Sequence, residues 1–113
     1  MKEIKAIIQP EVCESVITAL KQITGLPGVT VSEVKGFGRS RALDAADKVI
    51  EGSVEYAKKV KLEIVIPDGL LEQTLEAIRA HAHRGRPGDG KIFISTVDDI
   101  LKIRTGERGE AAV

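Results

Sequence analysis

A glycine-rich segment in the last third of the chain has the residue types best suited to bind an anion. It reads Gly-Arg-Pro-Gly-Asp-Gly-Lys over residues 85–91. Glycines let main-chain N–H groups converge on a charge without interference from a Cβ atom, and Lys91 adds a cation. The segment also meets the G-x-x-x-x-G-K pattern of phosphate-binding loops. The alternative interpretation is a tight turn that leads into a strand.

Two departures separate this segment from the loop of nucleoside triphosphatases. Ile92 stands where that loop carries the Ser or Thr that holds Mg²⁺. The order here is helix, loop, strand, whereas a triphosphatase loop precedes a helix whose N-terminus supplies positive charge. We therefore expect an anion site that belongs to a binding protein, and we expect that the chain is not an enzyme.

A second group of cations follows near the C-terminus. Lys102 and Arg104 are two residues apart in a segment, 100–104, that is patterned as a short strand, so we expect both on one face. Adjacent cations repel each other, and a bound polyphosphate would relieve that repulsion. The alternative is a pair of solvated charges or salt bridges to surface acids. Arg39 directly follows Gly36-Phe37-Gly38, and together these cations favour a nucleotide phosphate site.

Groups suited to catalysis or metal binding are sparse. His81 and His83 lie two residues apart near a helix end, so their side chains diverge and a metal would need further ligands. Cys13 lies on an apolar helical stripe, which favours a small core residue over a nucleophile. Ser40 and Ser53 have no base nearby in the sequence. A metal-binding protein that uses His81, His83 or Cys13 remains an alternative function.

The elements that position these groups follow from hydrophobic periodicity. The pattern predicts strands at 2–8, 29–36, 59–66, 91–95 and 100–104, and helices at 11–24 and 71–82. This order predicts an α+β fold: a ferredoxin-like βαββαβ sandwich with both helices on one face of the sheet, plus one extra C-terminal strand. Asp68 is expected to cap the second helix. The expected core includes Ala6, Val29, Val31, Leu62 and Ile64.

The segment 37–58 between the second and third strands has no convincing period. Unstructured insertions of this length inside a compact domain are uncommon and are often functional loops. We therefore interpret 37–58 as a functional loop. A short helix over 42–49 is the alternative, because Ala-Leu-Asp-Ala-Ala-Asp-Lys has fair helix propensity, and such a helix is compatible with the loop.

Composition bounds the class of protein. The 113 residues suit a single domain, 1–113, and 17 basic side chains balance 17 acidic ones. This balance argues against nucleic-acid binding and against electrostatic docking on anionic lipid. One cysteine excludes an intrachain disulfide, and no apolar run approaches the length of a membrane span. We expect a cytoplasmic protein without membrane insertion.

Several separate blocks of the sequence resemble the PII signal-transduction family, in order and at matching spacing. They are residues 1–10, 29–39, 60–68, 88–93 and 103–107. The resemblance implies a ferredoxin-like subunit, a homotrimer, and ATP or ADP held between subunits, with or without bound Mg²⁺. It also implies that 37–58 is the loop that contacts effector proteins and that 105–113 is a C-terminal loop and tail.

The resemblance carries nucleotide-binding roles to individual residues. Those matching positions near the phosphates are Gly38, Arg39, Ser40, Gly88, Asp89, Gly90 and Lys91. Those matching the adenine pocket are Thr30, Glu63, Ile64 and Val65. Arg104 matches directly, whereas Lys102 replaces an arginine, which keeps the charge and loses the bidentate fork.

Departures from the family pattern direct the functional hypothesis. Ser40 replaces a glutamine that helps to assemble Mg²⁺, ATP and 2-oxoglutarate, and Gly52 falls where some members carry a modified tyrosine. Tyr56 is expected to begin a strand, which leaves Ser53 as a weak candidate for modification. The loop 40–58 resembles a transport-associated, divergent PII-like group. The first hypothesis is thus a nucleotide-binding regulator of a membrane transporter, and the alternatives are a nitrogen regulator that senses 2-oxoglutarate and a trimeric metal-binding protein.

Overall fold

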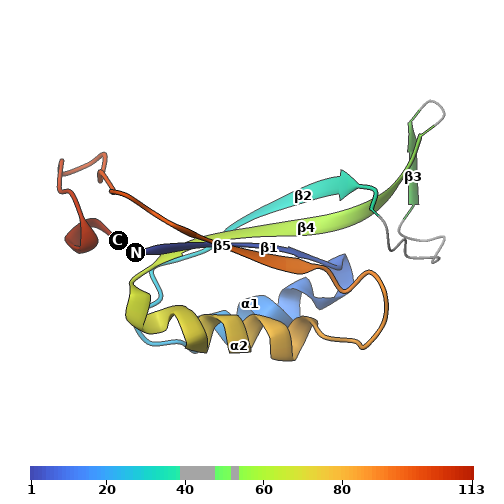
Figure 1. The fold of residues 1–113 in the computed structure, drawn as a ribbon, viewed down its shortest axis with the longest axis horizontal. Coiled ribbons are helices and arrows are strands. Elements are labelled where there is room, and N and C mark those ends of the chain that lie inside the picture. Colours follow the sequence, from blue (N-terminus) through green and yellow to red (C-terminus); the bar gives the residue numbers. More distant parts are fainter. Residues whose placement is uncertain (39–47, 52–53) are drawn as a thin grey trace.

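A computed structural model describes residues 1–38, 48–51 and 54–113. Two helices cover one face of an antiparallel sheet, which gives the α+β, ferredoxin-like arrangement expected from the sequence (Figure 1). The helices are α1 (Cys13–Lys21) and α2 (Leu71–Ala82). The strands are β1 (Lys2–Ile8), β2 (Thr30–Gly36), β3 (Lys48–Glu51), β4 (Val54–Ile66) and β5 (Lys91–Thr96).

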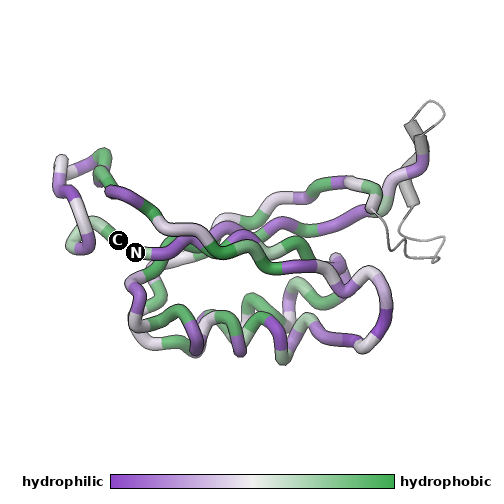
Figure 2. Tube along the Cα trace, in the orientation of Figure 1, coloured by the Kyte–Doolittle hydropathy of each residue, from purple (hydrophilic) through white to green (hydrophobic). Residues whose placement is uncertain are grey.

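The sheet has the strand order β2-β4-β1-β5, and β3 pairs with the beginning of β4. Its register places alternate apolar residues of β1 and β4 opposite each other, for example Ile4 opposite Ile64. Because side chains alternate across a strand, these residues all face the helices. Both helices contribute apolar residues to the same layer (Figure 2). The buried hydrophobic core consists of Ile4, Ala6, Ile8, Val12, Val16, Leu20, Ile23, Val60, Leu62, Ile64, Ile66, Ile78, Ala82 and Ala112.

Most of the expected core is confirmed, and one member is wrong. Ala6, Leu62 and Ile64 are at most 1% exposed, and Val29 is half-buried against the core. Val31 is 48% exposed although it lies opposite Leu62. The reason is that β2 is an edge strand with a neighbour on one side only.

The two helices differ from expectation mainly at their ends. The range predicted for the second helix matches α2, whereas α1 ends at Lys21 and is preceded by a 3₁₀ turn over Pro10–Val12. The prediction that Asp68 caps α2 is wrong. Its carboxylate instead pairs with the amino group of Met1 at 2.8 Å, and that hydrogen bond lowers the pKa of Asp68.

The expectation that 37–58 lacks regular structure is wrong over its second half. Residues 48–51 and 54–58 form strand, because β3 and the extended beginning of β4 pair as a hairpin. The alternative helix over 42–49 is also wrong at Lys48 and Val49, which belong to β3. Residues 42–47 of that predicted helix lie outside the described residues.

The C-terminal strand expected over 100–104 is absent from the described fold, which has a single bridge there, between Leu101 and Arg108. The main-chain N–H of Gly106 donates to the carbonyl of Lys102 at 2.8 Å, so the chain turns back on itself. The physical reason is that β5 pairs with β1, and the last such contact is from the N–H of Val97 to the carbonyl of Met1. The segment 100–104 lies beyond that last contact with β1 and is therefore not held in the sheet.

Candidate functional site

The face of the sheet opposite the helices carries much of the predicted site. Glu63 lies between buried Leu62 and Ile64 in β4, so its side chain points away from the helices. Two rows of residues cross this face: Thr30, Glu63, Lys5 and Phe93, and then Ser32, Lys61, Ile7 and Lys91. Lys61 and Glu63 form an ion pair at 3.5 Å. The face is thus a mixed surface of charged and apolar groups.

The residues predicted to line an adenine pocket are partly brought together. Thr30 is exposed and lies directly opposite Glu63, and Val65 is two residues further along β4 on the same face. The side chain of Ile64 is 1% exposed and belongs to the core, so Ile64 could meet a ligand only through its main chain. In the described sheet, the pairing of β2 with β4 ends at Glu63. The last residues of β4, 64–66, therefore have no strand partner on the side of β2.

The glycine-rich loop has a backbone that only glycine adopts readily. Gly85, Gly88 and Gly90 have φ angles of +79°, +99° and +102°. At Gly90 a Cβ atom would lie 1.7 Å from the carbonyl oxygen of Ile7, so the loop packs directly on β1. The glycines are therefore required by the turn and by a close approach to the sheet.

Part of the expected anion nest is already occupied by Asp89. Its Oδ2 accepts hydrogen bonds from the main-chain N–H groups of Arg84 and Gly85, each at 2.9 Å. Desolvation opposes ionisation of this carboxyl, but the hydrogen bonds from Arg84 and Gly85, with the nearby His83, lower the pKa of Asp89 below its ordinary value. Asp89 thus acts as an acceptor inside the loop.

Lys59 is a residue of this region that the sequence did not single out. Its Nζ donates to the carbonyl oxygen of Gly88 at 2.7 Å, which ties the glycine-rich loop to β4. Alternation along β4 places Lys59 on the same face as Lys61 and Glu63, but its contact with Gly88 depends on how the loop packs on the sheet. Only the strand order and the course of the loop could have revealed it.

The two groups of predicted phosphate-binding cations do not meet within one chain. Lys91 begins β5 next to the glycine-rich loop, whereas Lys102 and Arg104 lie beyond the opposite end of β5 (Figure 1). A strand of this length spans about 20 Å. Lys102 lies 3.9 Å from the carboxylate of Glu107, which was the alternative for this cation. Gly38 follows β2, and Arg39, Ser40 and Ser53 lie outside the described residues.

Comparison with known proteins decides the family. The model of the family described as nitrogen regulatory protein P-II matches residues 1–107. Proteins named nitrogen regulatory protein P-II from Azospirillum brasilense and Bradyrhizobium diazoefficiens are 45% and 47% identical to this chain. Nitrogen regulatory protein P-II 1 of Escherichia coli is 42% identical, and all three alignments cover 113 residues and 100% of both chains. The chain belongs to the P-II family.

This P-II chain exposes several large apolar side chains. Phe93 is 55% exposed on β5, and the C-terminal segment adds Leu101 at 63% and Ile103 at 98%. Phe37, 65% exposed at the end of β2, contacts Tyr56 with ring centroids 6.0 Å apart. None of the helices in the described segments is long and apolar enough to cross a membrane. Exposed apolar side chains of this size are candidates for protein–protein contact.

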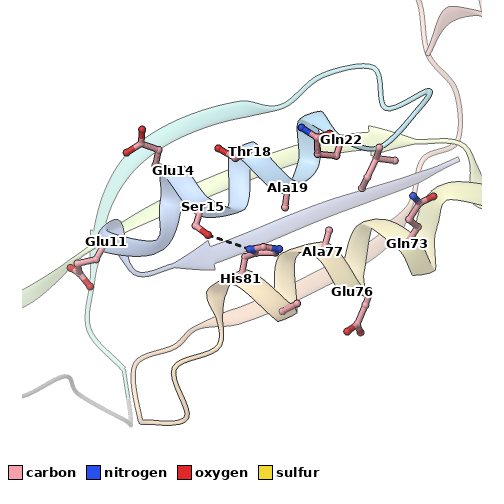
Figure 3. A pocket seen from close by; sticks show the side chains of 12 residues that line it. Glu11, Glu14, Ser15, Thr18, Ala19, Gln22, Gln73, Glu76, Ala77 and His81 are labelled. Atoms are coloured by element: carbon pink, nitrogen blue, oxygen red, sulfur yellow. Dashed lines mark hydrogen bonds between the residues drawn. The ribbon is translucent and has the colours of Figure 1, made fainter.

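The P-II chain also has an open groove of about 980 Å³ between α1 and α2 (Figure 3). Ser15 and His81 meet across it, with 3.2 Å between Oγ and Nδ1. The carboxylate of Glu11, at the rim, pairs with Arg84. A general base is usually oriented by a third group, and among the described residues no carboxylate accepts a hydrogen bond from His81.

The groups considered for metal binding remain scattered. Over the described ranges, no group of three or more His, Cys, Asp and Glu side chains could hold a metal ion. His81 contacts Ser15, whereas His83 lies beside the glycine-rich loop, near Gly85. Cys13 packs against the core, and burial raises the pKa of its thiol, which disfavours the thiolate needed by a ligand or nucleophile.

Proposed function

We propose that this P-II protein is a cytoplasmic signal-transduction regulator that binds ATP or ADP between the subunits of a homotrimer. AMP is a further candidate ligand. The nucleotide would bias the conformation of the loop 37–58, and that loop would control a partner protein, for which we propose a membrane transporter. A switch of this kind requires that the nucleotide bind two loop states with different affinities.

One observation carries the proposal: the two groups of predicted phosphate ligands lie at opposite ends of β5. Lys91 and the glycine-rich loop occupy one end, and Lys102 and Arg104 follow the other. In a head-to-tail ring, one subunit's loop meets the next subunit's C-terminal segment at every interface. Three equivalent sites would result, each built from two chains. The exposed Ile103 and Phe93 would be covered by the same contacts.

Calorimetry with ATP, ADP and AMP tests binding, and the native mass tests the trimer. Lack of binding below millimolar concentration for all three nucleotides would show that the nucleotide proposal is wrong. A monomeric mass would remove the shared site.

Mixed trimers test whether the site is shared. Lys91→Ala and Arg104→Ala should each lose most of the ATP affinity. After the two variants are unfolded and refolded together, roughly a quarter of the interfaces should pair an intact loop with an intact Arg104 and bind normally. The matched control is a double variant refolded alone, which should recover nothing. If the mixture also recovers nothing, each site lies within a single chain.

A second candidate function is nitrogen regulation through 2-oxoglutarate. The names of the relatives favour it. Ser40 weighs against it, because a hydroxyl is shorter than the amide that it replaces and offers fewer hydrogen bonds. Titration of 2-oxoglutarate in the presence of ATP and Mg²⁺ separates the two. Saturable binding at micromolar concentration would support the nitrogen sensor, whereas its absence would favour the transporter regulator.

A further inference from the structure

The contacts of Asp89 run inward, toward its own loop. Oδ2 holds the N–H groups of Arg84 and Gly85 at 2.9 Å each, so one oxygen closes the loop on the helix side. Oδ1 is buried, and the described residues give it no hydrogen-bond partner. With one oxygen engaged and the other covered, the carboxylate is poorly placed to coordinate a cation or to touch a ligand.

The peptide unit between Gly88 and Asp89 is fixed from two sides. Its carbonyl oxygen accepts from Nζ of Lys59 at 2.7 Å, and its N–H donates to the carbonyl of Arg86 at 3.4 Å. The next residue, Gly90, is pressed against the carbonyl of Ile7. Asp89 therefore stands at the point where the loop, β4 and β1 are joined.

We propose that Asp89 is a positioning residue: its carboxylate clasps the loop so that Gly88, Gly90 and Lys91 are presented to the nucleotide phosphates. This inference rests on the proposed nucleotide-binding function. It gives a role to Asp89, whose negative charge makes it unsuited to contact a phosphate directly. Preorganised donors bind an anion better because less ordering remains to be done when the ligand arrives.

The negative charge of Asp89 determines in which direction the ATP affinity should change. If Asp89 lay close to the phosphates without ordering the loop, removing its negative charge would relieve repulsion and tighten ATP binding. If it positions the loop, Asp89→Ala should weaken ATP binding in spite of the lost repulsion. The two roles thus predict opposite changes in one measured affinity.

The experiment compares wild-type protein, Asp89→Ala and Asp89→Asn, after native mass and melting temperature establish that each variant assembles as the wild type does. Asp89→Ala should bind ATP roughly tenfold more weakly, and Asp89→Asn, which keeps an acceptor oxygen, should recover part of that loss. Adenosine, titrated by NMR, has no phosphate and should bind all three proteins alike. A loss that is equal for ATP and adenosine would indicate general damage and overturn the proposal, as would unchanged or tighter ATP binding.

Amide hydrogen exchange in nucleotide-free protein keeps failure of this inference separate from failure of the proposed function. The N–H groups of Arg84 and Gly85 should exchange faster in Asp89→Ala than in the wild type. Unchanged exchange would show that there is no clasp, whatever the protein binds. If exchange accelerates as expected but wild-type protein does not bind ATP, Asp89 does order the loop. In that case the nucleotide proposal is wrong, and so is the role in phosphate binding that we assign to Asp89.

Discussion

Replacement of Gly90 by alanine should be among the most damaging single-methyl changes in this protein. A Cβ atom there would lie 1.7 Å from the carbonyl oxygen of Ile7 and 2.9 Å from its carbonyl carbon. Real Cβ contacts essentially never fall under 3.0 Å, so the loop and β1 would have to separate by about 1.3 Å. That displacement falls beside the pairing of Ile7 with Lys91, where β5 begins.

The expected cost has two parts. A φ of +102° strains any residue with a Cβ by about 1–2 kcal/mol. Disruption of one or two ladder hydrogen bonds, at about 1 kcal/mol each, and of the adjoining packing adds roughly 2–3 kcal/mol. The total is a large share of the roughly 5–15 kcal/mol that stabilises a typical domain. The melting temperature should fall by roughly 15 °C or more.

Gly85→Ala is the matched control, because it lies in the same loop and has a positive φ of +79°. The nearest atoms to its added methyl belong to the His83 ring at 3.9 Å, an ordinary contact, so only the strain should remain. Circular dichroism melts at one fixed subunit concentration measure both variants, since the stability of an oligomer depends on concentration. If the two variants melt within a few degrees of each other, the close approach of Gly90 to β1 does not limit stability and the reasoning is refuted.

Three further predictions concern single contacts. Lys59→Met keeps an apolar stem but loses the bond to the loop carbonyl, and calorimetry should show ATP binding weakened several-fold; an unaltered affinity would contradict this. Thr74 is fully buried and donates to the carbonyl of Leu70 at 2.7 Å, so urea unfolding of Thr74→Val should show a loss of about 1 kcal/mol, and no loss would mean that the bond is energetically neutral. The hydrogen bond from Arg108 lowers the pKa of Asp99 below its ordinary value of 3.8, so ionised Asp99 stabilises the fold above that pH, and this stabilisation is lost as the pH falls through the lowered pKa. Between pH 5 and pH 2 the melting temperature of Asp99→Asn should therefore fall less than that of the wild type. Equal falls would exclude this contribution.

The regular elements were predictable because hydrophobic period and backbone geometry coincide in them. Leu71, Ile78 and Ala82 recur at helical spacing, and α2 has the predicted bounds. In the same way, alternating residues such as Ile64 along β4 marked both the strand and its buried face. The hydrophobic pattern does not determine the order or the register of the strands. It therefore could not reveal that Val31 lies on an edge strand and is exposed.

Two segments escaped prediction for different reasons. The beginning of β4, from Val54 to Ala57, pairs with β3 and lies outside the part of β4 that pairs with β1. A strand segment that does not cover the core needs no hydrophobic alternation, so the sequence gives little signal there. The segment 100–104 carries apolar residues at strand spacing, yet Ile103 is 98% exposed, and the chain turns at Gly106. Its apolar pattern therefore cannot reflect packing within the described part of this chain.

For the candidate site, the sequence indicates residue types suited to binding an anion, but it does not assign their contacts. Asp89 was grouped with the phosphate ligands, whereas its carboxylate accepts from the main chain of its own loop. Lys59 has no distinguishing sequence signal, and its bond to Gly88 joins residues 29 positions apart. Such contacts depend on the course of a loop whose glycines permit many conformations, so spacing alone does not determine them.

The placement of Lys102 changes the reason for expecting a ligand near the C-terminus. Repulsion between neighbouring strand cations no longer argues for one, because the segment is a turn and Lys102 has Glu107 within 3.9 Å. The C-terminal segment is instead ordered within its own chain: Asp99 holds it through Arg108 and the N–H of Gly109, just as Asp89 holds the glycine-rich loop. Since each half is already fixed within its own chain, the step that would complete the proposed site is the docking of one subunit on the next.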